Sequence, residues 1–172
     1  MTASRSSNIT IKTKKPPRPI RAYFDGCCEP VNPGGTASFG AVVFKGEGRV
    51  WECSRLFRPI PGREHETSNN VAEYAGFIAI LEFLLEKGWE KEEVLVFGDS
   101  NLVIQQMFGD WQIRHGFYVP LALKAKGLVR RFPNMTGEWI PRERNGIADE
   151  LSKAELVKAG IEFRIQPEVA VG

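Results

Sequence analysis

The sequence predicts an α/β fold in which helices flank a five-stranded mixed sheet. Two observations lead to this fold class. Three β-rich segments come first along the chain, and helical segments then alternate with two further strands. Three antiparallel strands followed by crossover units imply a mixed sheet with helices on its faces. A chain of 172 residues is long enough to form one such domain with a hydrophobic core.

The strands are recognised by alternating or continuous apolar residues bounded by turn residues. The first, IRAYFDG, ends at Gly26 and is followed by the turn-rich loop CCEPVNPGGTA. The next two flank Gly46 and Gly48, which predicts a hairpin. The fourth is a short apolar run typical of a buried strand. The five strands are expected over residues 20–26, 38–48, 49–59, 93–99 and 136–142.

Four helices are predicted over residues 68–88, 101–109, 117–132 and 145–160. In the first, Ser68 or Asn69 can cap the start, and Gly88 stands where a helix end is expected. Pro120 falls in the first turn of the third helix, where proline is tolerated. Residues 59–67 are expected to form a loop.

The predicted domain covers residues 20–160, between a basic tail over residues 1–19 and an unassigned extension over residues 161–172. The tail is expected to be disordered, and two roles are open for it: sequence-independent attraction to phosphates, or solubilisation alone. It lacks the apolar core of a secretory signal, and no apolar run could span a membrane, so we expect a cytoplasmic protein. Three cysteines form neither a disulfide framework nor a zinc-binding CxxC pair.

Four acidic residues stand at element ends or next to apolar residues: Asp25, Glu73, Asp99 and Asp149. Each alone has an ordinary explanation, because aspartates often form turns at strand ends and an early helical glutamate interacts with the helix dipole. Together they are unusual, since a carboxylate at an apolar junction is costly unless it is compensated. A divalent cation would compensate them, and oxygen ligands without His or Cys suit Mg²⁺ or Mn²⁺.

The stretch FGDSN allows a different interpretation, in which Ser100 is the nucleophile of a hydrolase. A serine nucleophile needs a base, normally histidine, and an oxyanion hole. The only histidines are His65 and His115, and none follows near the C-terminus. The sequence therefore favours a role for Asp99 as a metal ligand.

The motifs FDGCCEPVNPGG, TSNNVAEYAG, FGDSNLV and IPRERNGIADELS, in this order, resemble type 1 ribonuclease H over residues 20–158. The resemblance implies the ribonuclease H-like fold and hydrolysis of the RNA strand of RNA–DNA hybrids, leaving a 3′-hydroxyl and a 5′-phosphate. It assigns two Mg²⁺ ions, replaceable by Mn²⁺, to a site of four carboxylates. Two such ions can clamp the attacking and leaving oxygens of an in-line displacement. The four matching positions are Asp25, Glu73, Asp99 and Asp149.

The same resemblance implies a substrate-binding surface, because discrimination of RNA from DNA needs contacts to the 2′-hydroxyl. Asn69 and Asn70 are alternatively plain helix-capping residues, and Trp111 is alternatively a core tryptophan. The implied positions are Asn32, Pro33, Gly34, Thr67, Ser68, Asn69, Asn70 and Trp111.

The sequence departs from the family pattern in two places. A histidine that many members have before the last aspartate is absent, and Arg142 is expected to assist water positioning or product release instead. A basic, tryptophan-rich insertion of some bacterial enzymes is also absent. Two alternatives therefore stay open: a non-catalytic nucleic-acid-binding module, and the same chemistry on double-stranded RNA. We expect a monomer that acts on an RNA–DNA hybrid and does not contact membranes.

Overall fold

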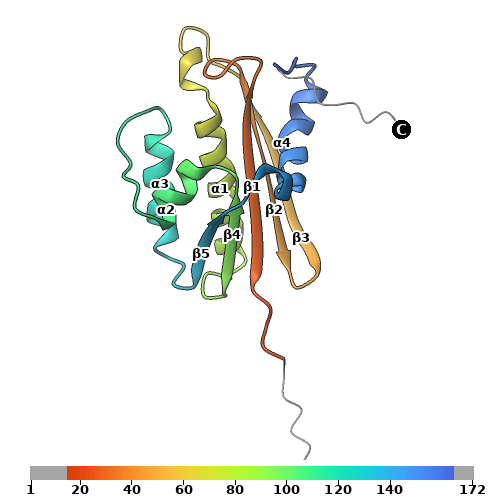
Figure 1. The fold of residues 1–172 in the computed structure, drawn as a ribbon, viewed down its shortest axis with the longest axis vertical. Coiled ribbons are helices and arrows are strands. Elements are labelled where there is room, and N and C mark those ends of the chain that lie inside the picture. The colour runs from red at the N-terminus through yellow and green to blue at the C-terminus, as the bar shows by residue number, and fades with distance from the viewer. Residues whose placement is uncertain (1–14, 165–172) are drawn as a thin grey trace, which may run out of the picture.

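A computed structural model describes residues 15–164, and its centre is a mixed sheet with the strand order β3-β2-β1-β4-β5 (Figure 1). β1 pairs antiparallel with β2, and β2 with β3, whereas β4 lies parallel to both β1 and β5. The predicted combination of an antiparallel meander and parallel crossovers is therefore confirmed. The strands are β1 (Ile20–Glu29), β2 (Thr36–Lys45), β3 (Gly48–Phe57), β4 (Val94–Gly98) and β5 (Met135–Trp139).

Helices cover both faces of this sheet (Figure 1). One face packs against α1, α2 and α3, and α4 lies on the other, over the β1–β3 half of the sheet. Two short 3₁₀ helices, η1 (Glu64–Glu66) and η2 (Arg142–Arg144), precede α1 and α4. The four predicted helices are confirmed as α1 (Asn69–Glu86), α2 (Asn101–Phe108), α3 (Val119–Val129) and α4 (Gly146–Lys158).

Several predicted boundaries differ from the structure. β1 continues past Gly26 to Glu29, because Cys27 and Cys28 pair with Ser38 and Ala37 of β2. β5 ends at Trp139 rather than at residue 142, since Pro141 lacks a backbone N–H and η2 follows it. The loop over residues 59–67 contains the η1 turn.

The helix starts agree with the capping expectation. Ser68 is the cap of α1, and its hydroxyl accepts a hydrogen bond from Val71 N at 3.3 Å. Ser100 caps α2 in the same way, accepting from Val103 N at 3.3 Å. The hydroxyl that the hydrolase interpretation requires as a nucleophile is thus a helix cap.

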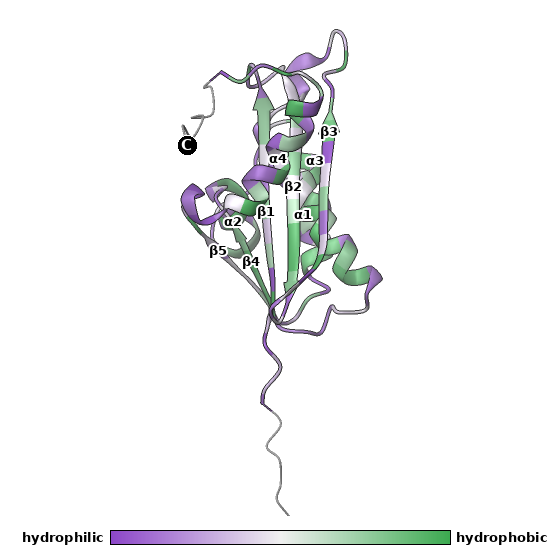
Figure 2. Ribbon diagram, turned by 90° about the vertical axis from the view of Figure 1, so that its right-hand side faces the viewer, coloured by the Kyte–Doolittle hydropathy of each residue, from purple (hydrophilic) through white to green (hydrophobic). Residues whose placement is uncertain are grey.

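The main core lies between the sheet and the layer formed by α1, α2 and α3. Figure 2 shows hydrophobic residues along β2, one of the central strands of this sheet. Ile20, Ala22 and Phe24 alternate along β1 and face it, which leaves the intervening residues of β1 on the α4 side. On α1, Glu73, Phe77, Ile80 and Leu84 are all buried. Among residues 15–164, no helix has both the length and the apolar character needed to cross a membrane.

The extension after α4 returns to the sheet. Arg164 donates through its backbone N and its Nε to Glu29 Oε2, at 3.0 and 3.1 Å, and through Nη2 to the Cys28 carbonyl at 3.0 Å. The beginning of the unassigned segment is therefore placed beside the end of β1. The rest of the predicted tail and extension, residues 1–14 and 165–172, lies outside the described residues.

Candidate active site

Asp25 and Asp99 meet where β1 and β4 separate. The last parallel pair between these strands is Phe24 with Gly98, so Asp25 and Asp99 are the next residues on each strand. β4 ends there, and β1 continues beside β2. Because Asp25 is the sixth residue of a ten-residue strand, it is held in the middle of the sheet and not at a frayed end.

Glu73 reaches this point from α1 because Gly26 allows the helix to come close. A Cβ atom at residue 26 would lie 2.5 Å from Glu73 N and 2.8 Å from the Ala72 carbonyl carbon. Only a residue without a side chain permits that approach. The carboxylates of Asp25, Glu73 and Asp99 then offer oxygens that all lie within 4.8 Å of one another.

The surroundings of these carboxylates oppose negative charge. Asp25 is 5% exposed and Glu73 is 7% exposed, and Glu73 Oε2 has no hydrogen-bond partner. Burial, followed by the charge of Asp99, raises the pKa of Asp25 to about 7. Burial and the charge of Asp25 likewise raise the pKa of Glu73 well above its ordinary value. A bound cation would reverse this effect by favouring the charged forms.

The donor set fits Mg²⁺ or Mn²⁺. Hard divalent cations take carboxylate oxygens, and oxygens that share one ion must be as close as these are. None of the ion pairs found among residues 15–164 involves Asp25, Glu73 or Asp99, so no basic side chain there already compensates them. The unpartnered Glu73 oxygen is directly available for such an ion.

Three neighbouring side chains, which the sequence analysis did not identify, hold the two aspartates. Ser152 Oγ donates to Asp25 Oδ2 at 2.5 Å. Asn145 Nδ2 donates to the Phe24 carbonyl at 2.8 Å and to Asp99 Oδ1 at 3.4 Å. Trp139 Nε1 donates to the Asp99 carbonyl at 3.1 Å. Groups of α4 and of the loop before it thus contact both carboxylates, and β5 holds the backbone of Asp99.

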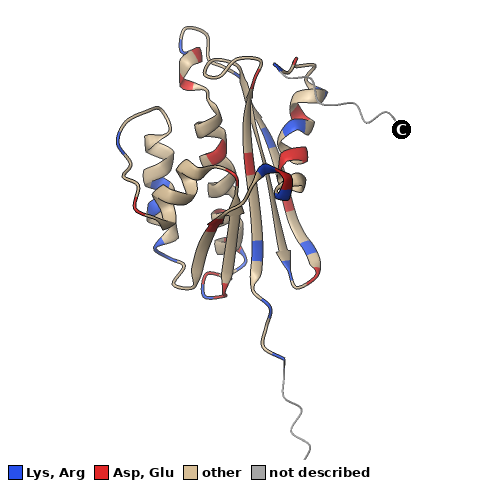
Figure 3. Ribbon diagram, viewed as in Figure 1, with Lys and Arg blue, Asp and Glu red and all other residues tan. Residues whose placement is uncertain are grey.

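Asp149 stands apart from the cluster of three. It lies in the first turn of α4, where its charge contributes to the raised pKa of Asp25. Its Oδ1 accepts from Arg142 Nε and Nη2 at 3.2 and 3.1 Å, and its Oδ2 accepts from Lys153 Nζ at 2.8 Å. Acidic positions of β1 and α4 accordingly flank the basic turn η2 in Figure 3. Arg142 thus contacts Asp149 directly, and two basic side chains, Arg142 and Lys153, compensate the charge of this fourth carboxylate.

The predicted substrate-binding residues near α1 come from two loops that the structure joins. Asn32 Oδ1 accepts from Asn69 N at 3.0 Å, and Gly34 N donates to the Thr67 carbonyl at 2.9 Å. Pro33 lies between the two anchor points, and Asn70 is exposed beside them. Asn69 Oδ1 is buried without a partner. The helix cap is Ser68, so the capping explanation of Asn69 and Asn70 was wrong.

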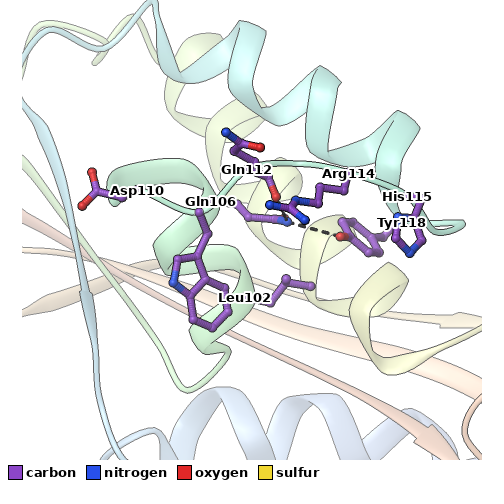
Figure 4. A pocket seen from close by; sticks show the side chains of 8 residues that line it. Leu102, Gln106, Asp110, Gln112, Arg114, His115 and Tyr118 are labelled. Atoms are coloured by element: carbon purple, nitrogen blue, oxygen red, sulfur yellow. Dashed lines mark hydrogen bonds between the residues drawn. The ribbon is translucent and has the colours of Figure 1, made fainter.

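Trp111 lies away from the core. Its side chain is 48% exposed and lines a cavity of about 500 Å³ together with Leu102 and Gln106 of α2 (Figure 4). The cavity lies beside α2, the helix that begins two residues after Asp99. The alternative of a core tryptophan was therefore wrong.

The strand order, the helices on both faces and the acidic cluster at the β1–β4 division together define a ribonuclease H-like domain. A family model described as reverse transcriptase-like matches residues 23–155, and the chain belongs to this family. The resemblance to type 1 ribonuclease H and the predicted fold class are thereby confirmed.

Curated relatives place the chain near type 1 enzymes. It is 36% identical over 121 residues to the bifunctional protein Rv2228c of Mycobacterium tuberculosis, a match that covers 70% of this chain and 31% of Rv2228c. It is 33% identical over 138 residues to ribonuclease HI of Halobacterium salinarum, covering 80% of this chain and 64% of the enzyme. The chain therefore spans less than one third of the mycobacterial protein.

Solved structures of type 1 ribonucleases H also superimpose on this chain. RNase H1 from Halobacterium salinarum superimposes with a TM-score of 0.68 at 31% identity, covering 81% of this chain and 98% of that chain. LC11-RNase H1 in complex with an RNA/DNA hybrid gives a TM-score of 0.69 at 33% identity, with the same coverage.

Proposed function

We propose that the protein is an endoribonuclease that hydrolyses the RNA strand of RNA–DNA hybrids and leaves a 3′-hydroxyl and a 5′-phosphate. The observation that carries this proposal is the convergence of Asp25, Glu73 and Asp99, with their oxygens within 4.8 Å, at the division between β1 and β4. The relation to ribonuclease HI, and to a relative whose structure contains an RNA/DNA hybrid, supports the choice of substrate.

Asp25, Glu73 and Asp99 would hold Mg²⁺, or Mn²⁺ in its place, and Asp149 would contribute beside them to a two-ion site. When bound, such ions neutralise charge on phosphate oxygens and activate water for in-line attack. The residues of the chain pre-arrange this site, because Ser152 and Asn145 already direct the carboxylates of Asp25 and Asp99. Preformed polar groups need little reorganisation during the reaction.

Arg142 would act at the Asp149 side of the site. Its guanidinium makes two hydrogen bonds to Asp149 Oδ1, yet its side chain is 63% exposed. An exposed guanidinium held at one point can also contact a phosphate oxygen or a water molecule. Arg142 would in this way orient the attacking water or help the product leave.

The joined loops before α1 would distinguish RNA from DNA. Asn32, Asn69 and Asn70 present amide groups there, and Glu73 follows on the next turn. Amide donors and acceptors suit a 2′-hydroxyl, which both donates and accepts hydrogen bonds. Gly34 permits close approach of a sugar or phosphate, and Thr67 and Ser68 would contact the DNA strand. Trp111, exposed on the cavity wall, would stack on a sugar of that strand.

Cleavage of one labelled RNA strand tests the proposal. The strand is offered paired with DNA, paired with RNA, or alone, with Mg²⁺, Mn²⁺ or EDTA, to the natural protein and to Asp99→Asn. We expect metal-dependent cutting of the hybrid alone, lost in the variant. Binding of the hybrid without cutting in either metal would contradict the proposal and favour a binding module. Cutting of the RNA duplex in preference to the hybrid would overturn the substrate assignment.

A further inference from the structure

Gln106 is a buried amide whose hydrogen-bonding groups are fully used. Its side chain is 3% exposed. Its Oε1 accepts from Tyr74 Oη at 2.6 Å, and its Nε2 donates to the Gln112 carbonyl at 3.1 Å and to Tyr118 Oη at 3.2 Å. A fully satisfied polar network in a core is rigid, and it is costly to break because each lost partner leaves a buried group unpaired.

This network ties together parts of the chain that are distant in sequence. Tyr74 follows Glu73 on α1, Gln106 lies on α2, and Tyr118 directly precedes α3. The rings of Tyr74 and Tyr118 also stack, at 5.7 Å between centroids and 4° between planes. Gln106 is therefore the point at which three helices and the connection between α2 and α3 are joined.

The connection over residues 109–118 is the part that depends most on Gln106. It contains no helix or strand. Near its ends, Trp111 N donates to the Gln105 carbonyl and Val119 N to the Gly116 carbonyl. Between these points, the bond from Gln106 to the Gln112 carbonyl fixes the backbone directly after Trp111.

The same connection forms the wall of the cavity of about 500 Å³ (Figure 4). Trp111, Arg114 and His115 come from it and line the cavity together with Gln106 and Tyr118. Arg114 and His115 are exposed, as is Trp111. An aromatic surface next to a cation suits the sugar–phosphate backbone of a nucleic-acid strand.

We propose that Gln106 is a positioning residue for substrate binding, which holds residues 109–118 in the shape that engages a strand of the hybrid. This inference rests on the proposed function. Gln106 faces the cavity and not the acidic cluster, so it acts on affinity and leaves the chemical step alone. A loop held in its bound shape loses less conformational entropy when the ligand arrives.

The test compares Gln106→Leu with the natural protein in hybrid cleavage and in hydrogen exchange of residues 109–118. We expect KM to rise about 5- to 10-fold, as for the loss of a buried hydrogen bond, with kcat unchanged. Amide exchange in this segment of the free variant should be faster. A reduced kcat at unchanged KM, or faster exchange with unchanged KM, would overturn the proposal.

A double-mutant cycle with Trp111→Ala separates positioning from general loss of stability. If Gln106 acts by placing Trp111, the second substitution adds little to the rise in KM that the first one causes. Effects that multiply in full would contradict the proposal. Gln105→Leu, on the same helix, is the matched control and should leave KM unchanged.

Tyr118→Phe is a second variant that tests the same network if Gln106→Leu does not fold. It removes one acceptor of Gln106 Nε2 and retains the ring that stacks on Tyr74. We expect a smaller rise in KM, and an unchanged KM would count against the network. Absence of hybrid cleavage by the natural protein would instead refute the proposed function, whereas the exchange measurement reports on the loop independently of substrate.

Discussion

Asp25 and Glu73 are carboxylates placed where the fold itself disfavours their charge. Both are almost completely buried, and burial raises the pKa of each, as does the charge of Asp99. The charge of Asp25 also raises the pKa of Glu73. The hydrogen bond from Ser152 lowers the pKa of Asp25 but does not cancel the effect of burial. Such an arrangement costs stability in the metal-free protein, and perturbed carboxylates of this kind are typical of functional sites.

The metal-free protein should lose stability as the pH rises from about 4 to about 7. Asp25 has a pKa of about 7 when folded and an ordinary value of 3.8, so the folded state binds the proton more tightly. Its contribution is fully present below the lower value and is lost through the upper one. The shift of about three units corresponds to up to about 4 kcal/mol. Thermal unfolding in EDTA at several pH values measures this trend.

Asp25→Asn is the control for the pH dependence. The amide does not titrate, so the fall in melting temperature between about pH 4 and 7 should become shallower. Added Mg²⁺ should raise the melting temperature of the natural protein most at neutral pH, where the carboxylates are charged, and should raise that of the variant less. Parallel pH curves for the two proteins would show that another group is responsible.

Arg142→Ala should lower kcat by about tenfold, a loss expected from removing a hydrogen bond to a charged group. The guanidinium is held by Asp149 Oδ1 and is otherwise exposed, so the substitution should leave the melting temperature nearly unchanged. Single-turnover and steady-state rates separate water positioning from product release. Arg144→Ala, in the same turn η2, controls for loss of charge alone, and full turnover of Arg142→Ala would refute the assigned role.

The sequence indicated the carboxylates of the candidate site but not the groups that hold them. Asp25, Glu73 and Asp99 stand in motifs, and the resemblance assigned their roles. Ser152 and Asn145 lie 127 and 121 residues from their partners Asp25 and Phe24, so no local pattern links them. One signal was present, because Ser152 follows Asp149 by three residues and must share its side of the helix.

Strand ends were also hard to predict from the sequence, because they too depend on residues that are distant along the chain. The alternation of IRAYFDG predicted a strand that ends at Gly26, since the following Cys-Cys-Glu-Pro reads as the start of a loop. In the structure, β1 continues for three residues because β2 begins early enough to pair with them, Glu29 opposite Thr36. A strand end depends on its partner, which is a non-local property, whereas helix starts depend on caps such as Ser68 that are visible locally.

Gly26→Ala should disturb the contact between β1 and α1 on which the site depends. The new methyl group would lie 2.5 Å from Glu73 N, so α1 must move. Overpacking of this kind costs about 1–3 kcal/mol, and the movement would separate Glu73 from Asp25. We expect a lower urea midpoint together with a loss of metal-dependent cleavage that exceeds the loss of folded protein.

Gly127→Ala is the matched control within a helix. Gly127 lies in α3, and a Cβ atom there would have nothing within 4 Å. Alanine is favoured over glycine in helices by about 1 kcal/mol, so this variant should gain stability and keep its activity. Equal behaviour of the two alanine variants would mean that the close approach at Gly26 is not required.

The candidate active site depends on the whole molecule, because its residues come from the sheet and from the helices on both of its faces. Asp25 lies on the central strand, Glu73 comes from the helix layer on one face, and Asp149 and Ser152 come from α4 on the other. Residues from the sheet and from the helices on both of its faces come together where β4 stops and β1 continues. Composition and periodicity could predict the layers, but the meeting point required the register of the strands.

Net charge is another property of the whole molecule, and the excess of basic over acidic residues comes from the N-terminal tail. Residues 1–19 contain no acidic residue, and the formal net charge of the entire chain is only +2. Replacing the basic residues of the tail by glutamine would therefore change the net charge from +2 to −3. The five positions are Arg5, Lys12, Lys14, Lys15 and Arg18.

The variant with these five substitutions should bind an RNA–DNA hybrid more weakly, and its affinity should depend less on salt concentration. Each lost phosphate contact reduces the slope of log K against log salt by about 0.9, because fewer counterions are released. Affinities measured between about 50 and 200 mM salt give that slope. The acidic cluster is unchanged, so kcat at saturating hybrid should stay the same. Identical slopes for the two proteins would show that the tail makes no phosphate contact, and affinity would then depend on the folded domain alone.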